Sequence, residues 1–262
     1  MDLGLQDKVA LVTGASRGLG RAAAEALAAE GARLAIGAHS EAIATAAQEI
    51  QARHGRPVLG LQADLTLPDD VDRFVDQAVA AYGRIDILVT NIAGPRPGAF
   101  LDLTPADWTA AVDLTLMSVV RLCYAVVPRM VKQGSGTIIA NQSYAVKQPI
   151  ENLVLSNSVR MAVVGLMKSL AGELGPKGIR VNSIHPGWTG TERVVHLFED
   201  RAMRAGTSPE VEAQRIVDTI PLGRMATPDE FGRTVAWLAS PAASYVHGHA
   251  LLVDGGIVKT AL

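Results

Sequence analysis

A glycine-rich segment near the N-terminus has the residue types and spacing that bind phosphate. The segment TGASRGLG (13–20) follows the apolar run KVALVT (8–13) and opens an alanine-rich helical stretch. Gly14 permits a tight turn, Gly18 lets the backbone approach a phosphate, and Gly20 permits close helix packing. The helix N-terminus adds free N–H groups and a positive dipole end. We therefore expect dinucleotide binding rather than a purely structural turn, at Gly14, Ser16, Arg17, Gly18, Leu19 and Gly20.

Residues after the second apolar strand indicate which dinucleotide is bound. This strand ends in AIGAHS (35–40), with no Asp or Glu where an acidic residue would hold the ribose hydroxyls of NAD. Arg17, His39 and Ser40 can instead surround a 2′-phosphate, which favours NADP(H) over NAD(H). The alternative is that Arg17 and His39 are solvated loop residues. The segments ADL and TNIAG follow the third and fourth strands, and they are expected to line the adenine and the nicotinamide ribose through Asp64, Leu65, Asn91, Ile92 and Ala93.

The elements that position these residues alternate along the chain. Runs rich in Val, Ile and Leu predict buried parallel strands at 8–13, 32–37, 57–62, 85–90, 136–140, 179–184 and 250–254. Helical periodicity follows the first strand up to Gly31 and recurs over 40–54, 68–82, 104–131, 152–174, about 190–219, and 227–239. This order predicts a single α/β domain with helices on both faces of a parallel sheet and a ligand site at the carboxyl ends of the strands. The long connection over about 187–226 is the expected substrate lid.

Composition and charge argue against several classes of function. The 262 residues are 48% hydrophobic and 19% charged, which suits one large folded domain. The 24 basic and 26 acidic residues are spread without blocks, so nucleic acid and membrane lipid are not expected as partners. The single cysteine, Cys123, cannot form an intramolecular disulfide, and its apolar neighbours predict a buried helix face. Since no signal-peptide pattern and no apolar run of about 20 residues is present, we expect a cytoplasmic protein.

Several motifs in order resemble the short-chain dehydrogenase/reductase family over nearly the full length. They are TGASRGLG, ADL, LVTNIAG, LAGELGPKGIRVNSIHPGW, PLGRMATPDEFGRTVAWLAS and the final LLVDGG. The closing segment is similar to the 3-oxoacyl-acyl-carrier-protein reductase branch. The resemblance implies a doubly wound Rossmann fold with a seven-stranded parallel sheet, and a homotetramer or homodimer built on paired helices and the C-terminal strand. It also implies a loop over the nicotinamide at Pro186 and Gly187, with Thr189 or Thr191 binding the carboxamide.

The catalytic positions of the family are altered in this chain. In the family, a serine binds the substrate carbonyl, a tyrosine donates the proton, a lysine lowers the tyrosine pKa and holds the ribose, and an asparagine supports a relay water. The resemblance places Ser143 at the serine, Ser156 at the tyrosine, Arg160 at the lysine and Asp113 at the asparagine. A serine hydroxyl is a far poorer proton donor than a phenol, whose pKa is about 10. Arg160 keeps the positive charge and can bond ribose hydroxyls, but it cannot release a proton, and Asp113 is expected to pair with it.

Two further side chains offer a replacement acid. Tyr144 and Lys147 follow Ser143 in SYAVKQPIEN, and the resemblance implies that this loop runs beside the substrate carbonyl. The chain also resembles a divergent subgroup of the reductase branch that carries a similar loop and lacks the full set of catalytic residues. We hypothesise that Lys147 or Tyr144 supplies the proton while Ser143 orients the carbonyl. The alternative is that both side chains face solvent or a neighbouring subunit.

The residues together predict an NADP(H)-dependent oxidoreductase that acts on a carbonyl or alcohol substrate. The competing interpretation is a cofactor-binding sensor or an inactive partner subunit, which the absent tyrosine and lysine favour. A lyase or epimerase that keeps the cofactor is a third possibility. Trp188 is expected to contact substrate, and Arg96, Asn152 and Arg193 are candidates for contact with a polar or anionic substrate.

The histidines predict no metal site. His185 is expected to be a packing residue at the end of a strand. His247 and His249 have no metal-ligand spacing with carboxylates or cysteines, so we expect them to be surface or interface residues.

Overall fold

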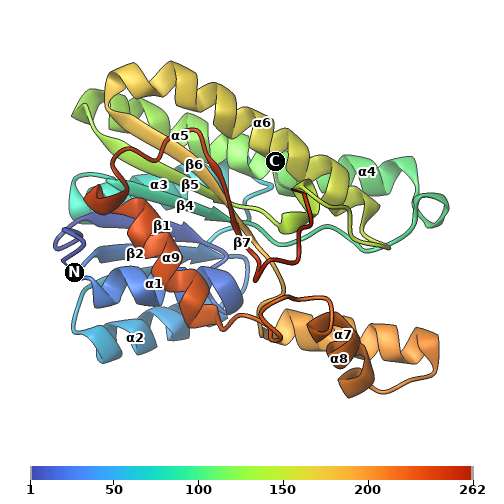
Figure 1. Cartoon of the computed structure of the whole chain (residues 1–262). Helices are drawn as coiled ribbons and strands as arrows, with labels where there is room; N and C mark the ends of the chain where they lie inside the picture. The colour runs from blue at the N-terminus through green and yellow to red at the C-terminus, as the bar shows by residue number, and fades with distance from the viewer. Residues whose placement is uncertain (1, 261–262) are drawn as a thin grey trace.

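Seven parallel strands form the centre of the molecule (Figure 1). The computed structural model describes residues 2–260. The strands pair in the order β3-β2-β1-β4-β5-β6-β7, and every neighbouring pair is parallel. Because the order reverses between β1 and β4, the carboxyl ends of these strands open a crevice. The bounds are β1 Val9–Thr13, β2 Arg33–Ala38, β3 Val58–Gln62, β4 Ile87–Asn91, β5 Gly136–Asn141, β6 Ile179–Pro186 and β7 Ala250–Val253.

Helices cover both faces of this sheet. One apolar core lies between the sheet and the helices α1, α2 and α9, and the other lies between the sheet and α3, α5 and α6. Figure 1 shows α1, α2 and α9 on one side of the sheet and α5 and α6 on the other. The helices are α1 Gly18–Ala29, α2 Ala42–His54, α3 Pro68–Tyr82, α4 Pro105–Ala111, α5 Ser118–Gln133, α6 Val154–Leu174, α7 Glu192–Ala205, α8 Pro209–Val217 and α9 Pro228–Ala239. The predicted doubly wound fold with a seven-stranded parallel sheet is confirmed.

The strands are uniformly apolar because both faces of the sheet are covered. All five residues of β1 are buried, and so are the first four of β4. β6 is longer than its apolar run predicted, because His185 and Pro186 still pair with Leu252 and Val253 of β7. The sheet therefore continues up to the Pro-Gly turn.

One long predicted helix is three segments in the structure. Instead of a single helix over 104–131, the chain forms α4, a π-helical turn over Val112–Met117, and α5. The wider π turn re-aims the side chains within it, including that of Asp113. The continuous helical segment Pro105–Gln133 is long and apolar enough to cross a membrane by composition alone. It packs against the sheet through Val119, Leu122, Val126 and Met130, which is the position of a core helix.

The segment between β6 and α9 forms two helices of its own. Figure 1 shows α7 and α8 at one end of the sheet, apart from the two helical layers. They join the rest of the molecule through an apolar cluster made of Tyr144, Trp188, Phe198, Ile220 and Ile257. Tyr144 belongs to the loop after β5, so the predicted lid segment packs directly on the loop that carries the candidate acids.

Candidate active site

The glycine turn after β1 forms a cradle for phosphate. Gly14 and Gly18 have φ values of 58° and 60°, in the left-handed region that favours glycine. Gly20 lies so close to β4 that a Cβ there would be 2.6 Å from Asn91 Nδ2. Helix α1 begins at Gly18 with no side-chain cap and no acidic residue in its first turn, so its N–H groups remain free for a ligand. These features fit the diphosphate of a dinucleotide.

Two asparagines connect this cradle to the neighbouring strands. Asn91 at the end of β4 donates a hydrogen bond from Nδ2 to Gly14 O at 3.0 Å, and Asn141 at the end of β5 donates one to Asn91 Oδ1 at 2.7 Å. Thr13 Oγ1 accepts from Asn91 N at 3.0 Å and donates to Asn91 O at 3.1 Å. Sequence reasoning missed Thr13 and Asn141 as positioning residues. Their signal was a polar residue at the end of an otherwise apolar strand.

Exposed basic side chains follow β1 and β2, namely Arg17 after β1 and His39 after β2. Arg17 pairs with Glu192 at the start of α7 over 3.3 Å, and both side chains are well exposed. His39 Nδ1 lies 3.5 Å from an oxygen of Asp64, which follows β3. Hydrogen bonds from the Thr66 hydroxyl and amide lower the pKa of Asp64, so this carboxylate is ionised at neutral pH. The crevice thus has a carboxylate after β3, whereas β2 ends at Ala38 and is followed by His39 and Ser40, with no carboxylate among them.

The other predicted cofactor residues surround the same crevice. Ser16 is half-buried in the glycine turn, and Ser40 Oγ accepts a hydrogen bond from Ala42 N at 3.2 Å. Leu19, Leu65 and Ile92 pack against the two apolar cores, which leaves their backbone rather than their side chains to meet a ligand. Ala93 is exposed in the loop after β4.

Ser143 and Tyr144 begin a short 3₁₀ turn after β5. Ser143 Oγ accepts a hydrogen bond from Ala145 N at 3.1 Å, which fixes the hydroxyl at the end of the strand. Tyr144 is buried, and its hydroxyl accepts a hydrogen bond from Trp188 Nε1 at 3.0 Å. Burial raises the pKa of Tyr144, so its phenol stays protonated at neutral pH. Trp188 stacks on Phe198 of α7 with ring centroids 5.5 Å apart, so Trp188 anchors the α7–α8 segment and only 7% of its surface is open to a substrate.

Lys147 lies near the buried end of β6. Its side chain is exposed, and its positive charge contributes to a lowered pKa of His185. His185 is completely buried, with its Nε2 at 2.8 Å from Ser183 Oγ, and burial is the main cause that lowers its pKa to about 4. His185 is therefore a neutral packing residue at the strand end, as the sequence indicated.

The helix α6 pairs Ser156 and Arg160 with each other. Arg160 Nε donates to Ser156 Oγ at 3.1 Å, and Nη1 donates to Gln142 Oε1 at 3.4 Å, a partner that sequence reasoning missed. Burial and the nearby charge of Arg193 lower the pKa of Arg160 to about 10. The expected pairing of Asp113 with Arg160 is wrong. Asp113 forms an ion pair with Arg121 over 2.5 Å, because both side chains lie on the continuous α4–α5 segment and are partly open to solvent.

The turn after β6 separates two candidate threonines. Thr189 is buried and donates a hydrogen bond to Gly187 O at 3.4 Å. Thr191 precedes α7 without a side-chain cap bond, and its methyl group lies 3.9 Å from the position of a Cβ on Gly18. Thr191 therefore faces the glycine turn across the crevice.

Arg193, in the first turn of α7, lies across the same crevice. Its guanidinium rests against Gly94 in the loop after β4, where any side chain at Gly94 would overlap it. Desolvation by the surrounding protein lowers the pKa of Arg193, although the residue as a whole is exposed.

Comparisons with known proteins decide the family. A family model described as enoyl-(acyl carrier protein) reductase matches residues 14–258. The chain is 35% identical to a 3-oxoacyl-[acyl-carrier-protein] reductase of Synechocystis over 97% of this chain and 98% of that protein. It is 34% identical to the corresponding Escherichia coli enzyme, FabG, over 97% and 99% of the two chains. The chain belongs to the short-chain dehydrogenase/reductase family.

Solved structures agree with this membership. The L-sorbose reductase of Gluconobacter frateurii, in complex with NADPH and L-sorbose, superimposes with a TM-score of 0.95 and 33% identity, over 99% of this chain and 100% of that chain. An actinorhodin polyketide ketoreductase with NADPH gives a TM-score of 0.93 and 32% identity, over 97% and 98%. The chain is therefore an enzyme of an oxidoreductase family.

His247 lies outside the crevice. His247 accepts a hydrogen bond from Val181 N at 3.1 Å and contacts Ala171 O at 2.8 Å, which makes it a structural residue. Residues 2–260 contain no group of three or more potential metal ligands.

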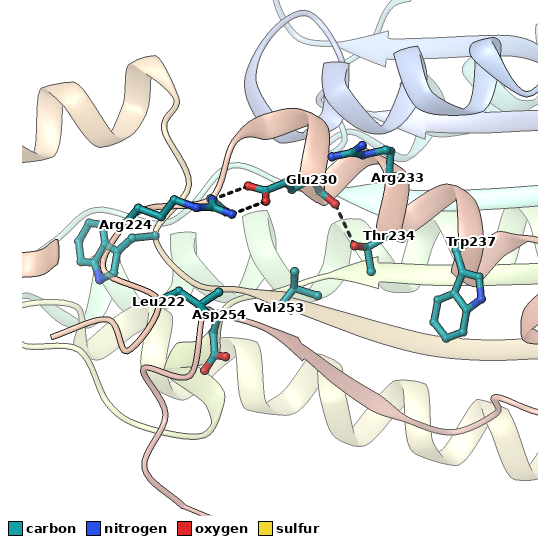
Figure 2. A pocket seen from close by; sticks show the side chains of 11 residues that line it. Leu222, Arg224, Glu230, Arg233, Thr234, Trp237, Val253 and Asp254 are labelled. Atoms are coloured by element: carbon teal, nitrogen blue, oxygen red, sulfur yellow. Dashed lines mark hydrogen bonds and ion pairs between the residues drawn. The ribbon is translucent and has the colours of Figure 1, made fainter.

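A separate pocket of about 480 Å³ lies between α9 and β7 (Figure 2), where Arg224 pairs with Glu230 over 2.7 Å. Its lining includes neither the glycine turn nor the Ser143 loop.

Proposed function

We propose that this protein is an NADP(H)-dependent oxidoreductase that transfers hydride between the nicotinamide and a carbonyl or alcohol substrate, as 3-oxoacyl reductases do. The observation that carries the proposal is the hydrogen-bonded link from Gly14 through Asn91 to Asn141, because it fixes the phosphate cradle beside the Ser143 loop. The family membership and the relatives that bind NADPH support it. The partner is a small molecule rather than nucleic acid or a membrane.

The crevice residues suit the successive parts of NADP(H). The free amides at the start of α1 bind the diphosphate. Arg17, His39 and Ser40 bind the 2′-phosphate, and the exposed pair between Arg17 and Glu192 is weak enough to open for it. The remaining contacts to adenine, ribose and nicotinamide come from Asp64, Leu65, Asn91, Ile92, Ala93, Pro186, Gly187 and Thr191. Once bound, the nicotinamide supplies or accepts a hydride at its carbon 4.

The proton follows a route different from that of the family. Ser143 holds and orients the substrate carbonyl oxygen, and Arg160 donates to the nicotinamide ribose. Lys147 or Tyr144 supplies the proton. Lys147 is the better placed of the two, because its ammonium is exposed above the end of β6 whereas the Tyr144 hydroxyl lies in the apolar cluster beneath α7.

Reduced-nicotinamide absorbance tests the proposal. The purified protein is mixed with NADPH, and separately with NADH, and offered ketones, 3-oxoacyl thioesters and quinones. Protein-dependent loss of NADPH, faster than the loss of NADH, is the expected result.

A sensor or inactive partner subunit is the second candidate. The observation that favours it is the bond between Arg160 and Ser156, which occupies the two positions where the family has its lysine and tyrosine. This candidate predicts saturable NADPH binding, measured by the fluorescence of the reduced nicotinamide, without oxidation by any carbonyl in the panel.

The assembly we propose is a cytoplasmic homotetramer, or a homodimer as its half. Tyr124 on α5 is 79% exposed and Met161 on α6 is 50% exposed, so both helices present apolar side chains outward. The edge of β7 is open, with the pocket of Figure 2 beside it. Light scattering of the purified protein tests the assembly, with a mass of two or four chains expected.

A further inference from the structure

Arg160 is a buried cation without a carboxylate partner. Its side chain is 7% exposed, and its hydrogen bonds go to the neutral groups of Ser156 and Gln142. None of its contacts within residues 2–260 is an ion pair. A guanidinium held in protein without a counter-ion is unfavourable unless an anion approaches it. Nη2 has no hydrogen-bond partner in this range and is not fully enclosed, so it is free to meet a ligand.

Arg193 is a second cation of the same crevice without a partner among the described residues. In the structure the neighbouring Glu192 pairs with Arg17 over 3.3 Å and not with Arg193. The guanidinium of Arg193 lies against Gly94, and its charge acts on Arg160 strongly enough to lower the pKa of that residue. Gly94 follows β4 and Gln142, the partner of Arg160, directly follows β5, so the two arginines lie at the ends of neighbouring strands.

Other charged groups nearby add to the positive potential. Arg201 lies 5.1 Å above the ring of Trp188, and Lys147 acts on His185 together with Arg160. Asp254 is an acidic group near Tyr144, and its two oxygens accept from the amides of Gly256 and Val258 at 3.0 Å.

We propose that Arg193, backed by the buried charge of Arg160, binds a carboxylate, and that the substrate of the reductase is therefore an oxo acid rather than a neutral ketone or thioester. This inference rests on the proposed function. A guanidinium fits a carboxylate through two parallel N–H···O bonds, whereas a neutral carbonyl compound would leave Arg193 without an anionic partner. In the reaction, hydride passes from NADPH to the carbonyl carbon, a proton joins the carbonyl oxygen, and the carboxylate leaves unchanged on the hydroxy acid beside NADP⁺.

Matched acid and ester substrates test this. Reduction of 2-oxobutyrate and acetoacetate is compared with reduction of their methyl esters, in the wild type, in Arg193→Gln, and in Arg204→Gln as a control on the same helix. Arg204 is exposed at the far end of α7 and forms no ion pair within residues 2–260. We expect the wild type and the control to prefer the acids by roughly 100-fold in kcat/KM, and Arg193→Gln to lose roughly 30-fold on the acids alone. Equal rates for acid and ester in the wild type would overturn the proposal.

A binding measurement separates the substrate site from the cofactor site. Malonate is titrated calorimetrically into the NADP⁺-saturated protein and into the free protein. The proposal requires binding in the NADP⁺ complex that Arg193→Gln abolishes and Arg204→Gln retains. Displacement of malonate by NADP⁺, with a raised KM for NADPH in Arg193→Gln, would show that Arg193 binds the cofactor diphosphate and would refute the proposal. If malonate binds as required while no carbonyl compound is reduced, the anion site stands and the proposed reductase function fails.

Discussion

Arg160 Nε donates a hydrogen bond to Ser156 Oγ over 3.1 Å, so the two residues that the resemblance places at the lysine and tyrosine positions of the family bind each other. The serine oxygen is occupied by the guanidinium, and both side chains are buried on α6. Ser156 is in this arrangement a positioning residue for Arg160. In the proposed mechanism, the proton that completes carbonyl reduction therefore comes from another group.

Replacing Ser156 tests its positioning role. In Ser156→Ala the guanidinium keeps its bond to Gln142 but loses the one from Nε. We expect kcat to change by less than about 3-fold and the KM for NADPH to rise several-fold, because a buried charged hydrogen bond is lost while no proton donor is removed. A fall of kcat by roughly 10³-fold or more, at unchanged KM, would instead identify Ser156 as the acid.

Lys147 and Tyr144 are the candidate acids. We expect Lys147→Ala to lower kcat by roughly 10²-fold and Tyr144→Phe to lower it less, since Tyr144 lies in the apolar cluster. Tyr144→Phe also leaves Trp188 Nε1 without its partner, which costs about 1–3 kcal/mol of unfolding free energy. Steady-state kinetics checks the first effect and chemical denaturation the second. The control is Lys177→Ala, at an exposed lysine beyond α6. Full turnover in the Lys147→Ala/Tyr144→Phe double variant would exclude both residues as the acid.

Arg17 sets the proposed preference for NADP(H). In Arg17→Ala we expect kcat/KM for NADPH to fall by roughly 30-fold while the value for NADH stays within about 2-fold, because the 2′-phosphate loses a charged hydrogen bond. The matched control is Arg21→Ala, since Arg21 lies one turn further along α1 and pairs with Glu49 over 2.6 Å. Equal losses with both cofactors would mean that Arg17 acts on a part that NADP and NAD share.

His185 links stability to pH. Its folded pKa of about 4 lies below the ordinary histidine value, so between these values the unfolded chain binds a proton that the folded chain does not. Stability therefore falls as pH falls, by up to about 1.4 kcal/mol per pH unit from this residue. We expect denaturant unfolding of the wild type to lose stability between pH 6.5 and 4 more steeply than His185→Gln does. Parallel pH curves for the two proteins would show that His185 keeps its ordinary pKa in the fold.

Most of the fold could be predicted from the sequence, because strands that are buried on both faces of the sheet are apolar along their whole length. The strands are continuous runs rich in Val, Ile and Leu. Glycines such as Gly31 and Gly83 mark where the helices between the strands end. The π turn before α5 was not readable, because residues 112–117 keep a helical apolar pattern and differ only in how the backbone winds. The pairing of Asp113 with Arg121 followed from that winding and was therefore missed as well.

The place of a candidate site residue could be predicted from the sequence where that residue comes shortly after a strand. The glycine turn and Ser143 belong to this class. Other contacts join segments that lie far apart in the sequence, and no local sequence pattern predicts them. They are Gln142 with Arg160, Trp188 with Tyr144, and Arg193 with Gly94. Trp188 illustrates the difference, since the sequence placed it against substrate while the structure packs it on Phe198.

Transfer of deuterium from NADPH labelled at nicotinamide carbon 4 tests the central claim most directly. The purified protein is incubated with each of the two stereospecifically labelled cofactors and a panel of carbonyl compounds that includes 2-oxobutyrate and acetoacetate. We expect deuterium from one of the two labelled cofactors, and not from the other, on the carbinol carbon of an alcohol product, detected by mass spectrometry. Saturable binding of NADPH with no deuterium in any product would contradict hydride transfer and favour a cofactor sensor.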